Sequence, residues 1–446
     1  MSTIEKHDMT QGKILLPLVS FTIPLVLGNL FQLTYNAADS VIVGKYVGEQ
    51  ALAAVGTSTP IMNIAILLIS GMCMGASVLM SSQYGAKDYD TLSRQISTTM
   101  LAGCGFSVVF SLLMLLLANP VLRLIRVPET AIPEAAAYLR IIFMGLIFTF
   151  MYNFLANTMR ALGDSKTPLY FLIGSSLGNI FLDYWFVAGL HWGVAGVAWA
   201  TFIAQGISAV CSFLIFLRSL RRLDGKAETW FSKAEFSSMS RIALPSILQQ
   251  STVSIGMMLV QSVVNGFGTQ ILAGFSAGMR IESLCVVPMA AIGNALSSYT
   301  AQNIGAEKHE RISLGYRTAN IMVAITAVIL CLFLELLHRP LIALFLDGAP
   351  SAQTVATGEG YLRFIGFFFC MIGFKMAVDG ILRGAGAVKV FTIANLVNLG
   401  LRVLIAKLGA PVYGIAMIWY AVPLGWLANF LISYGYYRTG KWKQLK

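Results

Sequence analysis

Four acidic side chains lie well inside long apolar stretches of this 446-residue sequence: Asp39, Asp183, Glu282 and Asp379. Three basic side chains do the same: Arg280, Lys375 and Arg402. A charge inside a bilayer costs roughly 2.5–3.5 kcal/mol on insertion scales, and more by other estimates. Residues kept at such a cost usually bind a proton, an ion or a charged ligand. These seven residues are therefore the first candidates for a functional site.

Asp39 and Asp183 stand out because each has an amide close by. Asn36 precedes Asp39 by about one helical turn, and Asn179 stands at i−4 from Asp183, on the same helix face. Two close carboxylates in an apolar setting cannot both ionise cheaply, so such a pair takes up a proton or holds a monovalent cation with amide and hydroxyl oxygens. Either property is what ion-coupled transport requires. The alternative is that both aspartates end their helices at the outer interface, since a glycine follows each within about two turns.

The charged residues of the second half leave more than one interpretation open. Glu282 and Arg280 are two positions apart, so they face different sides of a helix and each needs a partner from another helix. Lys375 and Asp379 stand at i, i+4, where they can neutralise each other. A direct role in drug binding is the other interpretation of this pair. Asn36, Glu282, Lys375 and Asp379 are thus candidates for a substrate path or a secondary site.

The elements that must position these residues are membrane helices. The chain is 57% hydrophobic and only 11% charged, whereas a soluble domain usually carries about 25% charge. Apolar stretches of roughly 20 residues, enough to cross a bilayer, recur along the whole chain. The pattern predicts an all-α polytopic membrane protein with helices over 15–43, 52–82, 91–118, 132–160, 168–189, 193–217, 240–265, 270–303, 312–337, 356–382, 388–408 and 412–437. Pro17, Pro24 and Pro245 are expected to interrupt or kink the first and seventh of them.

Basic residues are distributed unevenly between the two sides of these helices. The termini and the loops after every second helix hold 21 of the 31 Lys and Arg residues, whereas the opposite loops hold seven. This asymmetry predicts that both termini lie in the cytoplasm. The net charge of +11 therefore reflects the orientation of the helices in the membrane and does not indicate nucleic-acid binding. The basic residues are also expected to contact anionic lipid heads. The polar residues 1–14 and the long first apolar stretch do not fit a cleavable signal.

An internal repeat divides the chain into two halves. Residues 51–90 align with 271–310 at an offset of 220 without a gap, so that Gly85-Ala86-Lys87 falls on Gly305-Ala306-Glu307. At an offset of 223, Tyr138-Leu139-Arg140 falls on Tyr361-Leu362-Arg363. An even number of helices per repeat keeps both halves in one orientation, and parallel six-helix repeats are typical of transporters. We predict a lobe over 1–220, a lobe over 221–446 and a cytoplasmic linker over 220–240, with a short amphipathic surface helix in "TWFSKAEFSSMSR".

The repeat also makes the two halves unequal. Asp39 aligns near Leu259 or Val260, and the other alignments are Asp183 with Ala406, Asn179 with Arg402 and Thr201 with Val422. The acidic and amide cluster therefore belongs to the N-terminal half. Six cysteines lie in apolar stretches without ligand spacing and are expected to be small buried hydrophobes. Four scattered histidines make a histidine metal site unexpected.

Four segments resemble the multidrug and toxic compound extrusion (MATE) transporters. They are "IPLVLGNLFQLTYNAADSVIVGKYVGEQALAAVG", "NTMRALGDSKTPLY", "GNIFLDYWFVAGLHWGVAGVAWAT", and "SSYTAQNIGAEKHERI" with its partner "SSQYGAKDYD". The likeness covers essentially the whole chain and is greatest to the DinF-like bacterial branch. It implies the MATE fold of the MOP superfamily, with twelve transmembrane helices in two pseudo-symmetric bundles that alternate between outward-open and inward-open states.

The resemblance implies a secondary active antiporter, not an enzyme, that exports lipophilic, often cationic compounds in exchange for H⁺ or Na⁺. It implies a proton or sodium site in the N-terminal lobe at Asp39, Asn179, Asp183 and Thr201, with Asn157 nearby. The NorM branch instead uses acidic residues of the seventh and tenth helices. The seventh predicted helix here has no acid, and Asp379 does not clearly match the acid of the tenth.

Several further expectations accompany this interpretation. The protein should lie in the bacterial inner membrane, act as a monomer without a cofactor, and contact small amphiphilic substrates and lipids but no nucleic acid. A lipid-linked oligosaccharide flippase of the same superfamily is the first alternative function. A membrane-embedded enzyme is the second, although the histidines lack an accompanying catalytic motif. Loss of drug extrusion, against loss of a lipid product, distinguishes these functions.

Overall fold

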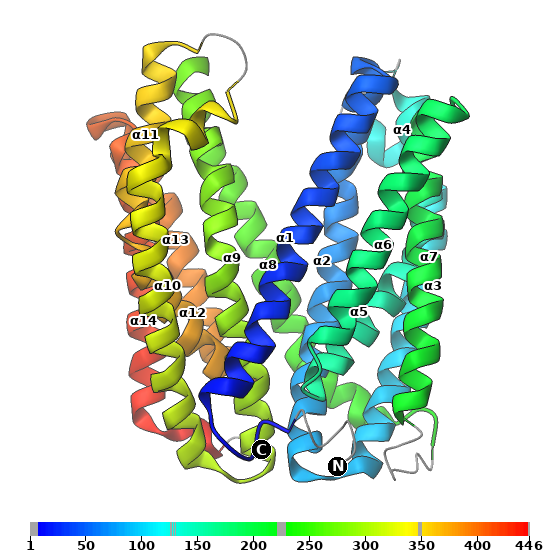
Figure 1. Ribbon diagram of the computed structural model, residues 1–446, viewed down its shortest axis with the longest axis vertical. Coiled ribbons are helices and arrows are strands. Elements are labelled where there is room, and N and C mark those ends of the chain that lie inside the picture. The colour runs from blue at the N-terminus through cyan, green and yellow to red at the C-terminus, as the bar shows by residue number, and fades with distance from the viewer. Residues whose placement is uncertain are drawn as a thin grey trace. The chain divides into compact units, whose positions relative to one another are not determined.

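The computed structural model describes residues 8–124, 127, 129, 131–220, 229–346 and 350–444, and over these residues the chain is helical without a β-strand. Fourteen α-helices follow one another there, as labelled in Figure 1. Their bounds are α1 Leu15–Tyr46, α2 Glu49–Ala86, α3 Tyr89–Leu124, α4 Ile132–Met144, α5 Leu146–Ala161, α6 Lys166–Tyr184, α7 Gly193–Leu220, α8 Lys233–Asn265, α9 Thr269–Gly305, α10 His309–Ala343, α11 Ala352–Gly366, α12 Phe369–Gly384, α13 Val388–Tyr413 and α14 Ala416–Thr439. A π-helical turn, η2, covers Trp185–Gly189, and a 3₁₀ turn, η3, covers Lys441–Gln444.

The lengths of these helices match a bilayer. Among the described residues, nine helices are long and apolar enough to span, and the bent pairs α4–α5 and α11–α12 raise the number to eleven if each pair is one span. The 33-residue α8 supplies the twelfth segment. The all-α fold of twelve segments, six in each half, is therefore confirmed.

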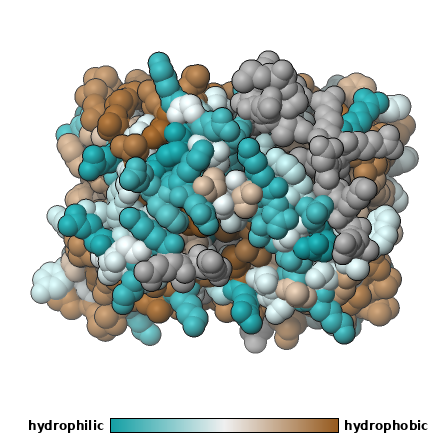
Figure 2. All heavy atoms as spheres, turned by 90° about the horizontal axis from the view of Figure 1, so that it is seen from below, coloured by the Kyte–Doolittle hydropathy of each residue, from teal (hydrophilic) through white to brown (hydrophobic). Residues whose placement is uncertain are grey.

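Apolar side chains on the outside of the helices also indicate a lipid environment. Leu116 on α3 and Leu336 on α10 are 79% and 78% exposed, and large apolar patches of this kind are rare on soluble monomers. Figure 2, seen from below the view of Figure 1, shows hydrophilic side chains gathered on one face and hydrophobic ones toward its margin. The chain is a multi-pass membrane protein.

Two of the expected helices are broken, in equivalent places of the repeat. The sequence predicted continuous helices over 132–160 and 356–382, and this is wrong: α4 and α5 meet at 46°, α11 and α12 at 53°. At the first break the backbone N–H groups of Gly145 and Phe148 donate to carbonyls three residues back, and Phe368 and Met371 do the same at the second. Gly145 and Phe368 are 223 residues apart, as are Phe148 and Met371, which is an offset of the internal repeat. A local change to i→i−3 bonds thus bends each span while keeping its backbone groups paired.

Proline, by contrast, does not interrupt α1 or α8, whereas the kinks expected at Pro24 and Pro245 stay predictions. Both α1 and α8 continue through Pro24 and Pro245. Two compact units share the described chain, and the boundary between them falls two residues after each of these prolines. Unit 1 contains Leu27–Ile247, and unit 2 contains Asp8–Val26 with Leu248–Lys446. The units thus differ from a division at residue 220, because each includes the opening part of the first helix of the other half.

Packing explains this exchange. Leu18, Phe21 and Leu25 of α1 are buried in the core of unit 2. In unit 1, a Cβ at Gly75 of α2 would lie 2.6 Å from the Cα of Ala243 of α8, so these two backbones are in close contact. Small residues permit such contact between membrane helices, where dispersion rather than the hydrophobic effect drives association.

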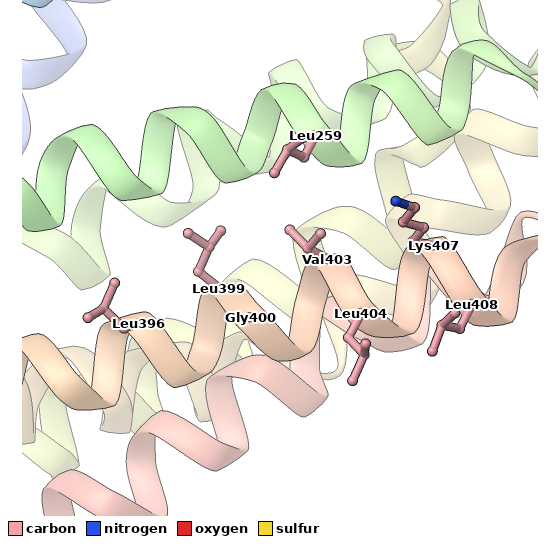
Figure 3. A pocket seen from close by; sticks show the side chains of 8 residues that line it. All are labelled: Leu259, Leu396, Leu399, Gly400, Val403, Leu404, Lys407 and Leu408. Carbon is pink, nitrogen blue, oxygen red and sulfur yellow. The ribbon is translucent and has the colours of Figure 1, made fainter.

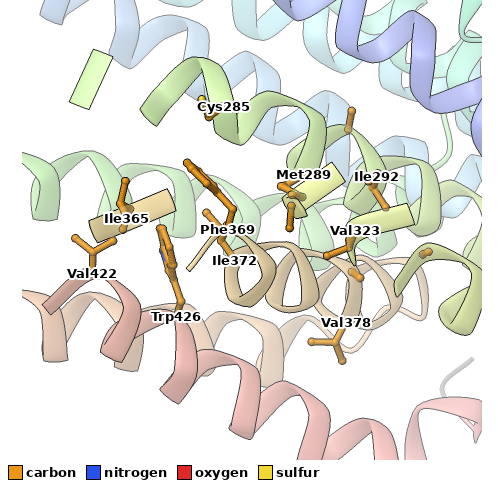
Figure 4. Close-up of a cluster of buried hydrophobic side chains, with 14 of the residues drawn as sticks. Cys285, Met289, Ile292, Val323, Ile365, Phe369, Ile372, Val378, Val422 and Trp426 are labelled. Atoms are coloured by element: carbon orange, nitrogen blue, oxygen red, sulfur yellow. The ribbon is translucent and has the colours of Figure 1, made fainter. Parts of the chain in front are cut away.

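The core of unit 2 has the same character. Figure 4 shows side chains converging from α9, α10, α11, α12 and α14, among them Met289, Val323 and Phe369. Beside them, a Cβ on Gly380 of α12 would collide with the backbone of Gly293 of α9. The position of α12 against α9 therefore depends on glycine, and α12 carries Lys375, Asp379 and Arg383.

The residues before α1 form a strap, Asp8–Gly12, on the connection between α9 and α10. Met9 is 2% exposed and its N–H donates to Gln302 Oε1 at 3.2 Å. Lys308 Nζ donates to the carbonyl of Thr10 at 2.9 Å, and Arg311 donates to the carbonyls of Met9, Gln11 and Gly12 at 3.4, 3.2 and 3.0 Å. Two basic side chains thus bind four consecutive carbonyl groups, which holds the beginning of α1 in unit 2.

We expect Arg311→Ala to release this strap, because hydrogen bonds from a charged donor contribute about 1.5–3 kcal/mol each. A cysteine placed at the buried Thr10 should then react with a thiol reagent about ten times faster, as followed by mass spectrometry of the purified protein. Arg317→Ala is the control, since Arg317 is an exposed residue of the same helix. Equal labelling rates in the two variants would show that Arg311 does not hold the strap.

The linker differs from its expected form. Residues 221–228 lie outside the described residues, so that part of the expected linker is not described. The following segment is not a separate surface helix, because α8 begins at Lys233 and continues into the membrane segment. The first turn of α8 and the residue before it are hydrogen-bonded to α3. Gln95 donates to Glu235 Oε2 at 2.8 Å, and Thr98 Oγ1 accepts from Ser232 N–H at 3.0 Å.

Candidate cation site in unit 1

The centre of unit 1 contains two buried polar residues of α6. Asn179 and Asp183 stand one turn apart on one helix face and are 4% and 0% exposed. The π-helical turn η2 begins two residues after Asp183, and such turns are frequent at functional sites. Asp183 does not reach the outer interface as a helix-end residue. It is enclosed by the unit.

Asp39 of α1 meets this pair from a neighbouring helix. Ile42 and Val43, at i+3 and i+4, are buried against Tyr138 of α4 and Val197 of α7, so this face of α1 is directed into the unit. The carboxyl groups of Asp39 and Asp183 are within hydrogen-bonding reach of each other. Two residues 144 positions apart in the sequence therefore form one site.

The oxygens around this pair are largely unused. Asn179 Nδ2 donates to Thr201 Oγ1 of α7 at 3.4 Å. Within the described structure, Asn179 Oδ1, one oxygen of Asp39 and both oxygens of Asp183 are buried without a hydrogen-bond partner. A buried polar atom without a partner costs about 1–3 kcal/mol, and more when it is charged. A proton shared by the carboxyl groups, or a monovalent cation held by carboxyl, amide and hydroxyl oxygens, removes that cost.

Two predicted residues have no described contact with this pair. Asn157 of α5 donates to the carbonyl of Asn153 in its own helix at 2.8 Å, and this accounts for its amide without a ligand. Asn36 of α1 is exposed. These roles stay predictions.

Sequence reasoning missed two tyrosines beside the site. Tyr35 and Tyr138 lie in electrostatic range of both Asp39 and Asp183. Tyr35 precedes Asp39 by one turn, and Tyr138 belongs to the Tyr-Leu-Arg block that occurs in both halves. The repeat was the available signal, because a tyrosine at the same place in two halves can serve a polar centre in each.

Unit 2 contains the other candidate residues, in two separate places. Lys375 Nζ lies 2.8 Å from Asp379 Oδ2 and donates to Asn395 Oδ1 at 3.1 Å. Ser433 of α14 donates to Asp379 Oδ1 at 2.8 Å. Lys375 and Asp379 are 9% and 5% exposed. The pair is thus neutralised and bonded on both sides, which favours a structural role over direct drug binding.

Glu282 of α9 has a different setting. Tyr361 of α11, which is 1% exposed, donates its hydroxyl hydrogen to Glu282 Oε2 at 2.5 Å. Arg402 of α13 lies in electrostatic range of Glu282, and Arg280 is exposed. Glu282 therefore finds its partners on other helices, as the spacing from Arg280 predicted.

A cavity of about 350 Å³ lies elsewhere in unit 2, between α8 and α13. Its lining is apolar except for one charged residue: Leu259, Leu396, Leu399, Gly400, Val403, Leu404, Lys407 and Leu408. In Figure 3, Lys407 points toward α8 at one end of the row. No predicted site residue lines this cavity.

The cysteines are unpaired, and one of them, Cys285, lies in electrostatic range of Glu282. All six are free, and two of them, Cys73 and Cys285, are buried. The expectation that all six are buried hydrophobes is wrong for Cys211, which is exposed on the apolar α7. Among the described residues, no three His, Cys, Asp or Glu side chains are grouped to hold a metal ion.

Comparison with known sequences gives one family. The MatE family model matches residues 24–185 and 245–408, one match in each half. The chain is 32% identical over 445 residues to the probable multidrug resistance protein YpnP of Bacillus subtilis, with 99% of both chains covered. It is 24% identical to the probable multidrug resistance protein NorM of Thermotoga maritima, covering 83% of this chain and 80% of that protein. It is 21% identical to the DNA damage-inducible protein F of Escherichia coli, covering 72% of this chain and 71% of that protein.

Solved structures show the same fold. A MOP superfamily transporter from Pyrococcus furiosus matches with a TM-score of 0.91 at 22% identity, over 99% of this chain and 100% of that one. An outward-facing MATE family transporter matches with a TM-score of 0.90 at 22% identity, over the whole of both chains. The family match in both halves and the near full-length similarity to YpnP agree with this fold. The chain belongs to the MATE family, and it is therefore a membrane transporter and not an enzyme.

Proposed function

We propose that this transporter exports small lipophilic compounds, cationic ones among them, from the cytoplasm in exchange for H⁺ or Na⁺. The relatives YpnP and NorM are both named as probable multidrug resistance proteins, which supports the substrate class. The ion is a co-substrate, and we expect no bound cofactor and a monomeric protein. The site of exchange is the Asp39–Asp183 centre.

One observation carries this proposal. Asp39 and Asp183 place two carboxyl groups in reach of each other in the buried centre of unit 1, and their oxygens together with Asn179 Oδ1 lack partners. Two buried carboxyl groups are costly when both are ionised and nothing is bound between them, and one proton or one monovalent cation lowers that cost. A site with this preference can bind a proton or cation from one side of a membrane and release it on the other.

Helix α1 supplies the coupling in this mechanism. Its residues up to Val26 pack in unit 2, whereas Asp39 lies in unit 1, so one continuous helix belongs to both. When a proton or Na⁺ neutralises Asp39, the cost of burying its carboxyl group falls and α1 packs more deeply in unit 1. Drug and ion then compete for conformations of α1, and a ligand shifts such an equilibrium only by its differential affinity for the two states.

Transport in vesicles tests the proposal. Purified protein is reconstituted into liposomes, and movement of the fluorescent cation ethidium is followed under a pH gradient alone, a Na⁺ gradient alone, or neither. We expect transport driven by at least one gradient and absent without any. Transport that is insensitive to both gradients would contradict ion-coupled antiport.

The distribution of basic residues predicts the orientation in the bacterial inner membrane. With both termini and the linker cytoplasmic, cysteines introduced at Ser2 or Gly225 should resist a membrane-impermeant thiol reagent in intact cells and react after permeabilisation. A cysteine at Glu129, in the loop between α3 and α4, is the matched control and should react in intact cells. The reverse labelling pattern would invert the topology.

A further inference from the structure

Two residues of the centre around Glu282 in unit 2 are the repeat partners of residues at the candidate cation site of unit 1. Tyr138 lies beside Asp39 and Asp183, and its repeat partner Tyr361 donates to Glu282. Asn179, whose amide faces the unit 1 site, aligns with Arg402. Unit 2 therefore repeats the arrangement of a tyrosine beside a membrane-embedded acid, but replaces the amide with a permanent positive charge.

The side chain of Arg402 is left without a bonded partner among the described residues. In the part of the chain that the structure describes, its guanidinium group takes part in no hydrogen bond and no ion pair, although it is near enough to Glu282 to interact electrostatically. Lys375 and Arg383 of α12, by contrast, both have side-chain acceptors. A guanidinium has five N–H donors and stays charged in proteins, so leaving it unpaired inside a membrane segment is costly.

Glu282, in turn, is held in position and is separated from Arg402. The ring of Tyr361 packs on Phe275 with 4.9 Å between centroids, and a Cβ on Gly278 would lie 2.8 Å from Tyr361 Cδ1. Tyr361 therefore cannot move easily, and its hydrogen bond fixes Glu282 Oε2. Both Glu282 and Arg402 remain partly exposed, which makes the two opposite charges accessible to a ligand.

Further unused polar atoms lie close to this pair. Asn398 stands one turn before Arg402, and its Oδ1 is buried without a partner in the described structure. The ring of Trp419 of α14 lies 5.9 Å from that of Tyr361 and 6.3 Å from that of Phe364, measured between centroids. Its indole Nε1–H is likewise buried without an acceptor in the described structure. The centre thus combines separated charges, a spare donor, a spare acceptor and an aromatic wall.

We propose that Glu282 and Arg402 form a substrate-recognition site for zwitterionic aromatic compounds, with the acidic group of the ligand on Arg402 and its amino group on Glu282. A purely anionic or purely cationic ligand would pair only one of the two charges, whereas a zwitterion pairs both. Bidentate pairing with a carboxylate is the interaction for which a guanidinium is best suited. The proposal rests on the proposed export function and identifies a substrate class for it.

Reconstituted transport of two fluorescent probes tests the site. Ciprofloxacin, which carries a carboxylate and an ammonium group at neutral pH, is the zwitterion, and ethidium is the cation. We expect Arg402→Gln to lower ciprofloxacin transport at least 10-fold while ethidium transport stays within about twofold of the wild type. Arg402→Lys, which retains the charge but not the fork of donors, should recover part of the loss. Lys407→Gln is the control, because it removes a positive charge from the same helix at the apolar cavity.

The possible failures are distinguishable. If the wild type transports neither probe under any gradient, the export function itself is wrong. If it transports ethidium but not ciprofloxacin, or if Arg402→Gln reduces both probes equally, the site does not recognise zwitterions. If neither Arg402→Gln nor Arg402→Lys yields a monodisperse protein in detergent, Arg402 is required for folding and the proposal fails.

Discussion

Asp39→Asn should reach the membrane in normal amounts and yet lose gradient-driven efflux at least 10-fold. The amide has the size of the carboxyl group and retains hydrogen-bonding capacity, but it cannot bind the proton or attract the cation. A loss of about 1.4 kcal/mol of coupling free energy already corresponds to a factor of ten. The measurement is ethidium efflux from cells and proteoliposomes under a fixed gradient, with expression and dye binding measured in parallel.

The control for this variant is a carboxyl group of the same unit that lies away from the site. Glu134→Gln changes an exposed residue in the first turn of α4 and should leave efflux unchanged. Normal pumping by Asp39→Asn would show that Asp39 does not couple the ion. Glu282 would then be the next residue to test, ahead of Asp379, because Asp379 is already paired with Lys375.

Asp183→Asn should abolish the response to the coupling ion altogether. Both oxygens of Asp183 are buried without a partner in the described structure, so this residue gains most from a bound proton or cation. A ligand that binds only the folded state stabilises it by RT ln(1 + [L]/Kd), or about 2.7 kcal/mol at 100 times Kd. The coupling ion should therefore raise the thermal midpoint of the purified wild type by several degrees, and should not raise that of Asp183→Asn.

Arg402→Asn is the informative comparison in the other half. Arg402 aligns with Asn179 but lies in unit 2, so this variant should keep the ion-dependent thermal shift. NaCl is compared with KCl at equal concentration, and the proton response is measured in a pH series. An equal loss of the ion response in Asp183→Asn and Arg402→Asn would mean that the two halves share the coupling. That result would contradict the confinement of the acidic and amide cluster to the N-terminal half.

The residues of the candidate site in unit 1 were largely predictable because they carry strong local signals. An aspartate inside an apolar helix is conspicuous, and the i, i+4 spacing of Asn179 and Asp183 places them on one face whatever the rest of the fold. Their interpretation as one site with Asp39 also needed the family resemblance, since nothing in the spacing joins residues 144 positions apart. The contact between their carboxyl groups depends on how α1 packs against α4, α6 and α7.

The broken spans show the opposite case. Hydropathy averages over about twenty residues, so α4–α5 and α11–α12 each resemble one continuous segment. The breaks arise from a few i→i−3 backbone bonds at Gly145 and Phe368, and neither place carries a proline. At Pro24 and Pro245, by contrast, the helix continues, so the expected interruption is absent.

The sequence by itself determined the membrane class, the twelve helical segments, the twofold repeat and the confinement of the acidic and amide cluster to the first half. These follow from local composition and spacing, because a bilayer imposes helix length and excludes unpaired charge. Only the tertiary structure decided which charges are used and which are left free. Lys375 and Asp379 are satisfied by Asn395 and Ser433 from other helices, whereas Arg402 faces Glu282 without bonding to it. Such pairing depends on distances of a few ångströms between helices far apart in sequence, and no local pattern encodes them.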